Sequence, residues 1–242
     1  MLEAVRDYPY AALKALYSNY GNGILSGFEI SLTKDGKFQI SPGILKWDGE
    51  VYIAPETFVI KQEDGKHYVY LTIQDTDVPD GKNVDLECRQ ASELKKNDFE
   101  LFKYNKSEGV AVSEYGDMEQ ASTNVDEPFK NPVNRIDQRA CRFAVIGGFT
   151  LCPKYYRLFA KEILKCPNAA PVDIAFAYQC LNGIHNIETV RQYFNGLYTN
   201  SDVLKQMKTA LDNLKAGGVV QEPEKPNVQE SKKPKESSFE VW

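Results

Sequence analysis

Glycine, proline and alternating apolar residues are concentrated between positions 20 and 55, and this stretch most restricts what the chain can fold into. Phe28, Ile30 and Leu32 alternate with polar residues, which is the period of a half-buried strand. Asp35-Gly36 separates this run from the next apolar run, at 38–40. Glycine accepts a positive φ at little cost, so the pair predicts a β-hairpin.

A second pair of strands should follow directly. Ser41-Pro42-Gly43 turns the chain into an apolar run at 44–47, and Asp48-Gly49 turns it again into a run at 51–53. Pro55 then ends the pattern, because proline cannot donate a hydrogen bond to a strand ladder. We expect the glycines at 21, 23 and 27 to interrupt the backbone before the first strand.

The remaining chain divides near Pro153 into a β-rich part and a helical part. Before it, strands are predicted at 57–61, 67–73, 84–89, 99–104, 109–113 and 143–149, with a long polar loop at 114–139. After it, apolar spacings of three and four predict helices at 155–164, 172–181, 187–193 and 203–214, the last with Ser201 as its N-cap and a stop at Gly217. The predicted class is α+β, an antiparallel β-sandwich or barrel-like domain followed by a small helical domain.

The two ends of the chain have a different character. Good helix formers follow Pro9, so a short helix is predicted up to Gly21, with one face packed on the sheet or on a neighbouring subunit. Residues 219–242 are rich in proline, lysine, glutamate and serine, which predicts an extended arm. The predicted organisation is therefore 1–25 helix and linker, 26–152 β-domain, 153–218 helical domain and 219–242 arm.

The early glycine-rich pattern resembles a known family. Residues Gly23-Ile24-Leu25-Ser26-Gly27-Phe28-Glu29-Ile30, Ile40-Ser41-Pro42-Gly43-Ile44 and Asp48-Gly49-Glu50-Val51-Tyr52 are similar to the small β-domain of bacteriophage tail, baseplate and tail-fibre-attachment proteins. The resemblance covers about a quarter to a third of the chain. It implies a β-fold and a structural role, and it brings no catalytic residues with it.

No pattern of catalytic or ligand-binding residues stands out in the sequence. The net charge is −5, which argues against binding to nucleic acid phosphates. Acidic residues at 75–81 could bind an ion but are interpreted as an exposed turn, and Asp98 with Glu100 could serve glycoside cleavage but is also a common surface pair. The five cysteines have no metal-binding spacing and should be reduced and buried. We predict a protein that is not an enzyme and that needs no metal or cofactor.

These observations favour a structural subunit of a phage or phage-derived tail, at the hub, baseplate or fibre junction. Such a subunit would be made in the bacterial host cytoplasm, reside in the virion, form an oligomer within a larger hetero-assembly, and lack a membrane span. The alternatives are a carbohydrate-binding or carbohydrate-cleaving β-domain protein and a cytoplasmic adaptor. The residues expected to bind other tail proteins come from the helix, the long loop and the arm: Leu13, Leu16, Tyr17, Phe129, Phe239, Val241 and Trp242.

Overall fold

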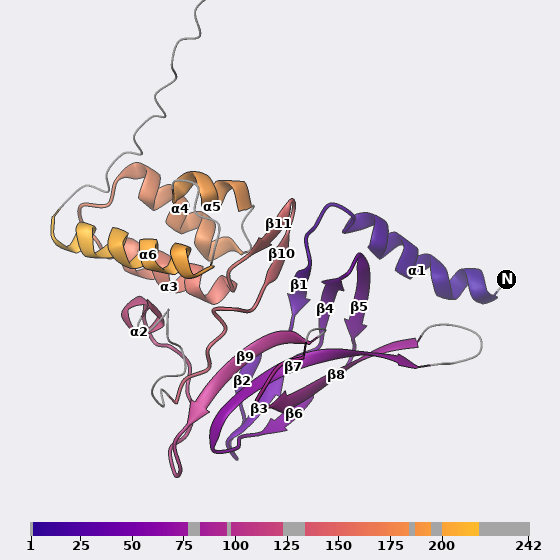
Figure 1. Ribbon diagram of the computed structural model, residues 1–242. Coiled ribbons are helices and arrows are strands. Elements are labelled where there is room, and N and C mark those ends of the chain that lie inside the picture. Colours follow the sequence, from indigo (N-terminus) through magenta and orange to yellow (C-terminus); the bar gives the residue numbers. More distant parts are fainter. Residues whose placement is uncertain are drawn as a thin grey trace, which may run out of the picture.

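A computed structural model describes residues 2–76, 83–95, 98–122, 134–183, 187–194 and 200–217 of the chain (Figure 1). The α+β class is confirmed. The helices are α1 (Leu2–Leu16), α2 (Met118–Ser122), α3 (Pro153–Ile163), α4 (Pro171–Asn182), α5 (Ile187–Tyr193) and α6 (Asn200–Lys215). The strands are β1 (Gly23–Gly27), β2 (Ile30–Leu32), β3 (Lys37–Ile40), β4 (Gly43–Trp47), β5 (Glu50–Ala54), β6 (Phe58–Lys61), β7 (Gly65–Thr76), β8 (Asn83–Ala91), β9 (Phe99–Lys106), β10 (Phe143–Val145) and β11 (Gly148–Thr150).

The strands form three sheets, ordered β11-β10-β1-β4-β5, β2-β3-β6 and β8-β7-β9. Neighbouring strands are antiparallel except for β1 and β10, which run parallel with Ile24 opposite Phe143. In the described part of the chain the sheets stay separate and do not close, so the barrel-like description does not hold (Figure 1). The parallel pair joins segments more than a hundred residues apart, which local periodicity cannot predict.

The two predicted hairpin turns are confirmed. Asp48 and Gly49 both have positive φ, +50° and +80°, and they join β4 to β5. Positive φ at both central residues is the hallmark of the type I′ turn, whose twist matches that of the paired strands. Gly36 has a φ of +74° in the turn between β2 and β3, where the Thr33 amide donates to the Lys37 carbonyl at 2.9 Å.

The glycines before Phe28 do not interrupt the fold as expected, since Gly23–Gly27 is itself strand β1. Phe28 instead leaves the strand with a φ of +54°, and its ring is buried. A Cβ on Gly43 would lie 2.5 Å from that ring, and one on Gly27 would lie 2.0 Å from the Pro42 carbonyl oxygen. The glycine pattern therefore serves close backbone and ring approach in the core more than chain reversal.

The switch to helix at Pro153 is confirmed, and α3, α4, α5 and α6 lie where apolar spacing predicts them. The last helix begins at Asn200, so Ser201 lies inside its first turn instead of capping it. At the other end, Gly217 has a φ of +76°, and its amide donates to the Leu214 carbonyl, as expected for a glycine that ends a helix. The segment expected as one strand at 143–149 is a hairpin of β10 and β11, turned at Gly147 with a φ of +82°.

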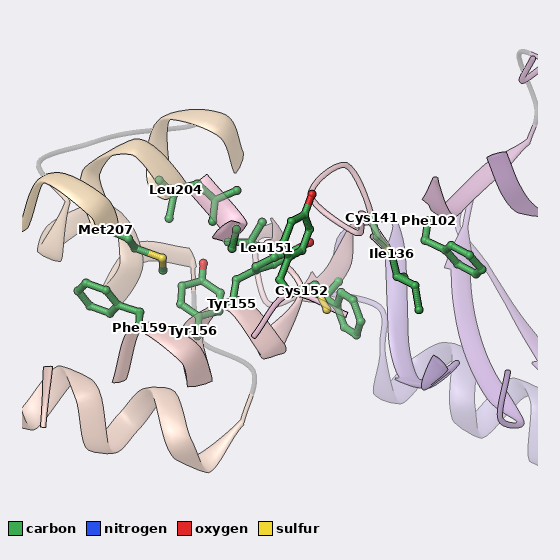
Figure 2. Close-up of a cluster of buried hydrophobic side chains, with 14 of the residues drawn as sticks. Phe102, Ile136, Cys141, Leu151, Cys152, Tyr155, Tyr156, Phe159, Leu204 and Met207 are labelled. Carbon is green, nitrogen blue, oxygen red and sulfur yellow. The ribbon is translucent and has the colours of Figure 1, made fainter. Parts of the chain in front are cut away.

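One hydrophobic core runs from the sheets into the helices (Figure 2). Ile136 and Cys141 connect the β-side of this core to Leu151 and Tyr155 on the helical side, and all four are at most 1% exposed. The Tyr155 hydroxyl also accepts a hydrogen bond from the Gln138 amide at 3.0 Å. The β-rich and helical parts thus share their interior across the expected boundary at 152.

Two expectations for the middle of the chain are wrong. Residues 109–113 form no strand, apart from a single bridge between Ser113 and Arg135. The described parts of the 114–139 loop contribute residues to the core: α2 buries Met118 and Ala121, and Asp137 exchanges backbone hydrogen bonds with Lys103 of β9 at 2.8 and 2.9 Å. The polar composition of this loop concealed a structural role, because its buried charges are paired with each other.

Asp137 and Arg139 form that pair, with side chains 6% and 7% exposed. Arg139 donates to the carboxylate through Nε at 2.9 Å and Nη2 at 2.7 Å, and its guanidinium lies over the Tyr115 ring. Burial opposes the charge on Arg139, but the hydrogen bonds to Asp137 raise its pKa overall. This two-pronged contact holds the end of the loop against the core.

Candidate interaction surface

Helix α1 extends away from the sheets (Figure 1). It begins at Leu2, not after Pro9 as the sequence suggested, so proline lies in its interior. An interior proline removes one backbone hydrogen bond, and here that loss does not end the helix. Fifteen residues at about 1.5 Å each give a rod of roughly 22 Å.

The body of the protein contacts α1 at its C-terminal end. Leu13, Tyr17 and Tyr20 are half-buried there, and the two tyrosine rings meet edge to face at 5.2 Å between centroids. They cover a small apolar cluster on the five-stranded sheet, made of Leu25, Val51 and Ala144. Leu13 and Tyr17, two of the residues expected to bind other tail proteins, therefore pack on the chain's own sheet, whereas Leu16 stays exposed.

A buried lysine fixes the end of α1 in place. Lys46 of β4 is 6% exposed, and its ammonium group donates to the carbonyls of Tyr17, Ser18 and Tyr20 at 2.6, 2.9 and 2.6 Å. Carbonyls at a helix C-terminus lack partners within the helix and carry partial negative charge, so a cation is stabilising there. A second lysine, Lys14, forms an exposed ion pair with Glu50 of β5.

The rest of α1 presents large apolar side chains to solvent. Tyr8 is 77% exposed, Tyr10 54% and Leu16 67%. Tyr8 and Leu16 lie eight residues apart, two turns along one side of the helix, with Ala12 between them. This side adjoins the one that carries Leu13 and Tyr17, yet its two large side chains stay exposed while the helix is anchored. We call Tyr8, Ala12 and Leu16 the α1 stripe.

Other predicted site residues fall outside the described part of the chain: Phe129, Phe239, Val241 and Trp242. The acidic stretch at 75–81 is described only at Asp75 and Thr76, the last two residues of β7. Among the described residues, no group of three His, Cys, Asp or Glu side chains is placed to hold a metal ion. None of the described helices has the length and apolar character of a membrane span.

The carboxylate pair at the start of β9 does not form an open site. Asp98 accepts a hydrogen bond from the Lys95 amide at 2.7 Å. Glu100 lies 3.8 Å from the ammonium group of Lys103, with its side chain 14% exposed. Burial raises the pKa of Glu100, and the nearby Lys103 charge opposes that rise.

A cleft that the sequence did not predict lies between α2, α3 and α6. Its volume is about 360 Å³, and it is lined by Asp117, Met118, Glu119, Glu162, Lys208, Leu211, Asp212 and Lys215. The charges in it are largely paired: Lys208 contacts Asp212 at 2.7 Å, and Glu162 contacts Lys215 at 3.6 Å. Because these charged side chains pair with one another, we interpret the cleft as a polar contact between helices and not as a ligand site.

The cysteines are free thiols, as the sequence suggested, but only three of the five are fully buried. Cys141, Cys152 and Cys180 are buried, Cys88 and Cys166 are half-buried, and all five are free thiols. Burial raises the pKa of Cys88 and of Cys180 to about 12 and also raises the pKa of Cys141 and Cys152. These four thiols are therefore protonated and poorly nucleophilic at neutral pH.

Comparison of the chain with protein-family models, with curated proteins and with solved structures gave no match.

Proposed function

We propose that this chain is a structural subunit of a bacteriophage or phage-derived tail, located at the hub, baseplate or fibre junction. The proposal rests on the glycine-rich pattern around Phe28 and Gly43, which resembles the small β-domain of such proteins. In this chain that pattern builds the packing of the Phe28 ring on Gly43 and the β4–β5 hairpin. Both are structural features, and the sheet they form is the platform that carries α1.

The observation that carries the proposal is the anchored, projecting α1. Three half-buried side chains and the Lys46 hydrogen bonds fix one end of the helix. The α1 stripe, with Tyr8 and Leu16 more than 60% exposed, is left uncovered by that attachment. An apolar helix face that is exposed in its own fold is suited to bind a hydrophobic groove on another protein, with residues at helical spacing as the anchors.

Assembly through α1 can be tested by substitution of the α1 stripe. The double variant Tyr8→Ser and Leu16→Ser removes the two large side chains of the stripe. Val59→Ser is the matched control, because Val59 of β6 is likewise an exposed apolar residue, 58% exposed, but lies outside α1. All variants should unfold within about 0.5 kcal/mol of the parent, since exposed side chains contribute little to stability. We expect the double variant to lose co-purification with the neighbouring tail gene products and incorporation into particles, while the control keeps both.

Particles that incorporate the double variant as well as the parent chain would refute the role of α1. Electron microscopy of particles with and without the chain would then locate it independently. Absence of the chain from every assembled particle would refute the tail assignment itself.

The carbohydrate-cleaving alternative would use Glu100 as its general acid; burial raises the pKa of this carboxyl, which suits the role, but the side chain lies beside Lys103 and not in an open site. Binding to a glycan array and release of sugars from bacterial surface polysaccharide would measure this activity. A cleaving enzyme should lose turnover in Glu100→Gln and keep glycan binding. A chain that neither binds nor cleaves glycans would exclude this function.

A further inference from the structure

Helix α4 has an unusual composition for a helix at a protein surface. Of its twelve residues, Pro171–Asn182, the only charged one is Asp173, and that side chain is fully buried. Its carboxylate accepts hydrogen bonds from the Ala170 amide at 3.1 Å and from the Tyr193 hydroxyl at 2.6 Å. The solvent-facing side of α4 is therefore left without a charge.

That side is also apolar. Ile174, Tyr178 and Leu181 follow one another at spacings of four and three, which places them on one stripe, and they are 37%, 57% and 37% exposed. Val172 adds a fourth apolar side chain at the start of the helix, 63% exposed. The opposite face packs Phe176, Ala177 and Cys180 into the core. The exposed side therefore carries an apolar stripe, with Gln179 and Asn182 as the polar residues beside it, and a helix with apolar residues on both faces is ordinarily covered on both.

The size of this α4 stripe, defined as Val172, Ile174, Tyr178 and Leu181, restricts what covers it. Four partly exposed side chains offer an apolar patch of a few hundred Å². Two copies of the chain meeting through this patch alone would bury less than the roughly 1,200 Å² typical of a stable dimer. A short apolar segment of the same chain needs a far smaller buried area to bind, because the covalent tether reduces the entropy cost of association.

The chain itself leads such a segment to α4. The described part ends at Gly217, where a Cβ would lie 3.9 Å from the side-chain nitrogen of Asn168, in the connection that precedes α4. Figure 1 shows the C-terminal end of α6, in yellow, at the same end of the helical region as the start of α4. The described chain therefore ends close to the connection that leads into α4, whose second residue, Val172, is the first of the α4 stripe.

The sequence of these residues fits the stripe in length and in chemistry. After polar, proline-containing residues at 221–238, which hold a single aliphatic side chain, come Phe239, Val241 and Trp242. A polar chain of about 21 residues has an r.m.s. span of roughly 25 Å, and α4 is about 18 Å long. A linker whose length matches the span gives a tethered segment an effective concentration on the order of 1 mM.

We propose that the Phe239-Glu240-Val241-Trp242 segment docks on the α4 stripe of the same chain. The three apolar side chains cover Ile174, Tyr178 and Leu181, and the linker crosses from Gly217 past Val172. Docking in this way shields the α4 stripe until a neighbouring subunit competes for either surface. This last step rests on the proposed assembly function, whereas the docking itself is a property of the isolated chain.

Tryptophan fluorescence of the isolated full chain tests the docking directly. The chain has two tryptophans, Trp47 and Trp242, so Trp47→Phe leaves Trp242 as the only indole. At an effective concentration near 1 mM, a segment with a Kd of about 0.1 mM is docked roughly ten times more often than free. We expect a blue-shifted Trp242 emission and several-fold weaker acrylamide quenching than in the synthetic peptide 218–242, both unchanged on dilution.

The stripe variant Ile174→Ser with Tyr178→Ser should return the emission and quenching of Trp242 to those of the peptide, whereas Tyr10→Ser, on α1 and 54% exposed, should not. If Trp47→Phe fails to fold, fluorine NMR of 5-fluorotryptophan-labelled parent chain makes the same measurement, with Trp242→Phe to assign the resonance. Peptide-like quenching in the full chain overturns the proposal, as does protection that is lost on dilution or that survives the stripe variant. Loss of particle assembly would not alter any of these readouts.

Discussion

Lys46 gives a quantitative test of how α1 is held on the sheet. Replacement by methionine keeps most of the side-chain volume and removes the ammonium group that bonds three carbonyls at 2.6 to 2.9 Å. Hydrogen bonds from a charged donor contribute roughly 1.5–3 kcal/mol each, but removal of the lysine also removes the cost of burying its charge. We therefore expect Lys46→Met to lower the free energy of unfolding by about 2–4 kcal/mol.

Lys14→Met is the matched control, because it also removes a lysine that joins α1 to the sheet. Both partners of its ion pair are more than half exposed, so the expected loss is below about 0.5 kcal/mol. Urea unfolding gives the global free energies, and amide hydrogen exchange at Tyr20 and Gly21 reports the local attachment. Equal effects of the two substitutions, or unchanged exchange at Gly21 in Lys46→Met, would refute the idea that the buried lysine anchors the helix.

Three further outcomes follow from the core. Gly43→Ala should destabilise the fold by about 1–3 kcal/mol or more in thermal unfolding, because its Cβ would lie 2.5 Å from the Phe28 ring; an unchanged Tm would show that this contact relaxes freely. Asp137→Asn should cost about 3–5 kcal/mol in urea unfolding by leaving Arg139 charged and buried, and a loss under 1 kcal/mol would contradict a tight pair. Burial raises the pKa of Glu100 above its ordinary value of 4.5 in the folded chain, so the folded chain binds more protons than the unfolded chain. The folded state therefore loses stability as the pH rises from the unfolded pKa through the folded pKa of Glu100. Glu100→Gln should therefore match the parent at pH 4 and be more stable at pH 8; the reverse order would contradict the assigned direction.

Hairpin turns and helices could be predicted from the sequence, because each depends on residues within one short segment of the chain. Asp48-Gly49 required positive φ at both residues, which selects one hairpin turn whatever surrounds it. The helices after Pro153 were likewise predictable, because apolar spacing along one segment reports which face is buried. The start of α1 was mispredicted, since the cost of an interior proline can be outweighed by the turns on either side of it.

Tertiary structure alone decided which segments meet. Nothing near Ile24 indicates that it pairs with Phe143, and nothing near Lys46 indicates three carbonyl partners at the end of α1, because those partners come from distant parts of the chain. The burial of Ile136 and Asp137 was hidden because a charged, aperiodic segment looks solvated until its distant strand neighbour, Lys103 of β9, is known. Composition gives α4 a single charged residue, Asp173, but only the folded arrangement shows that this residue is buried and that the apolar side of the helix is exposed. Exposure depends on what packs against a helix and not on the helix itself.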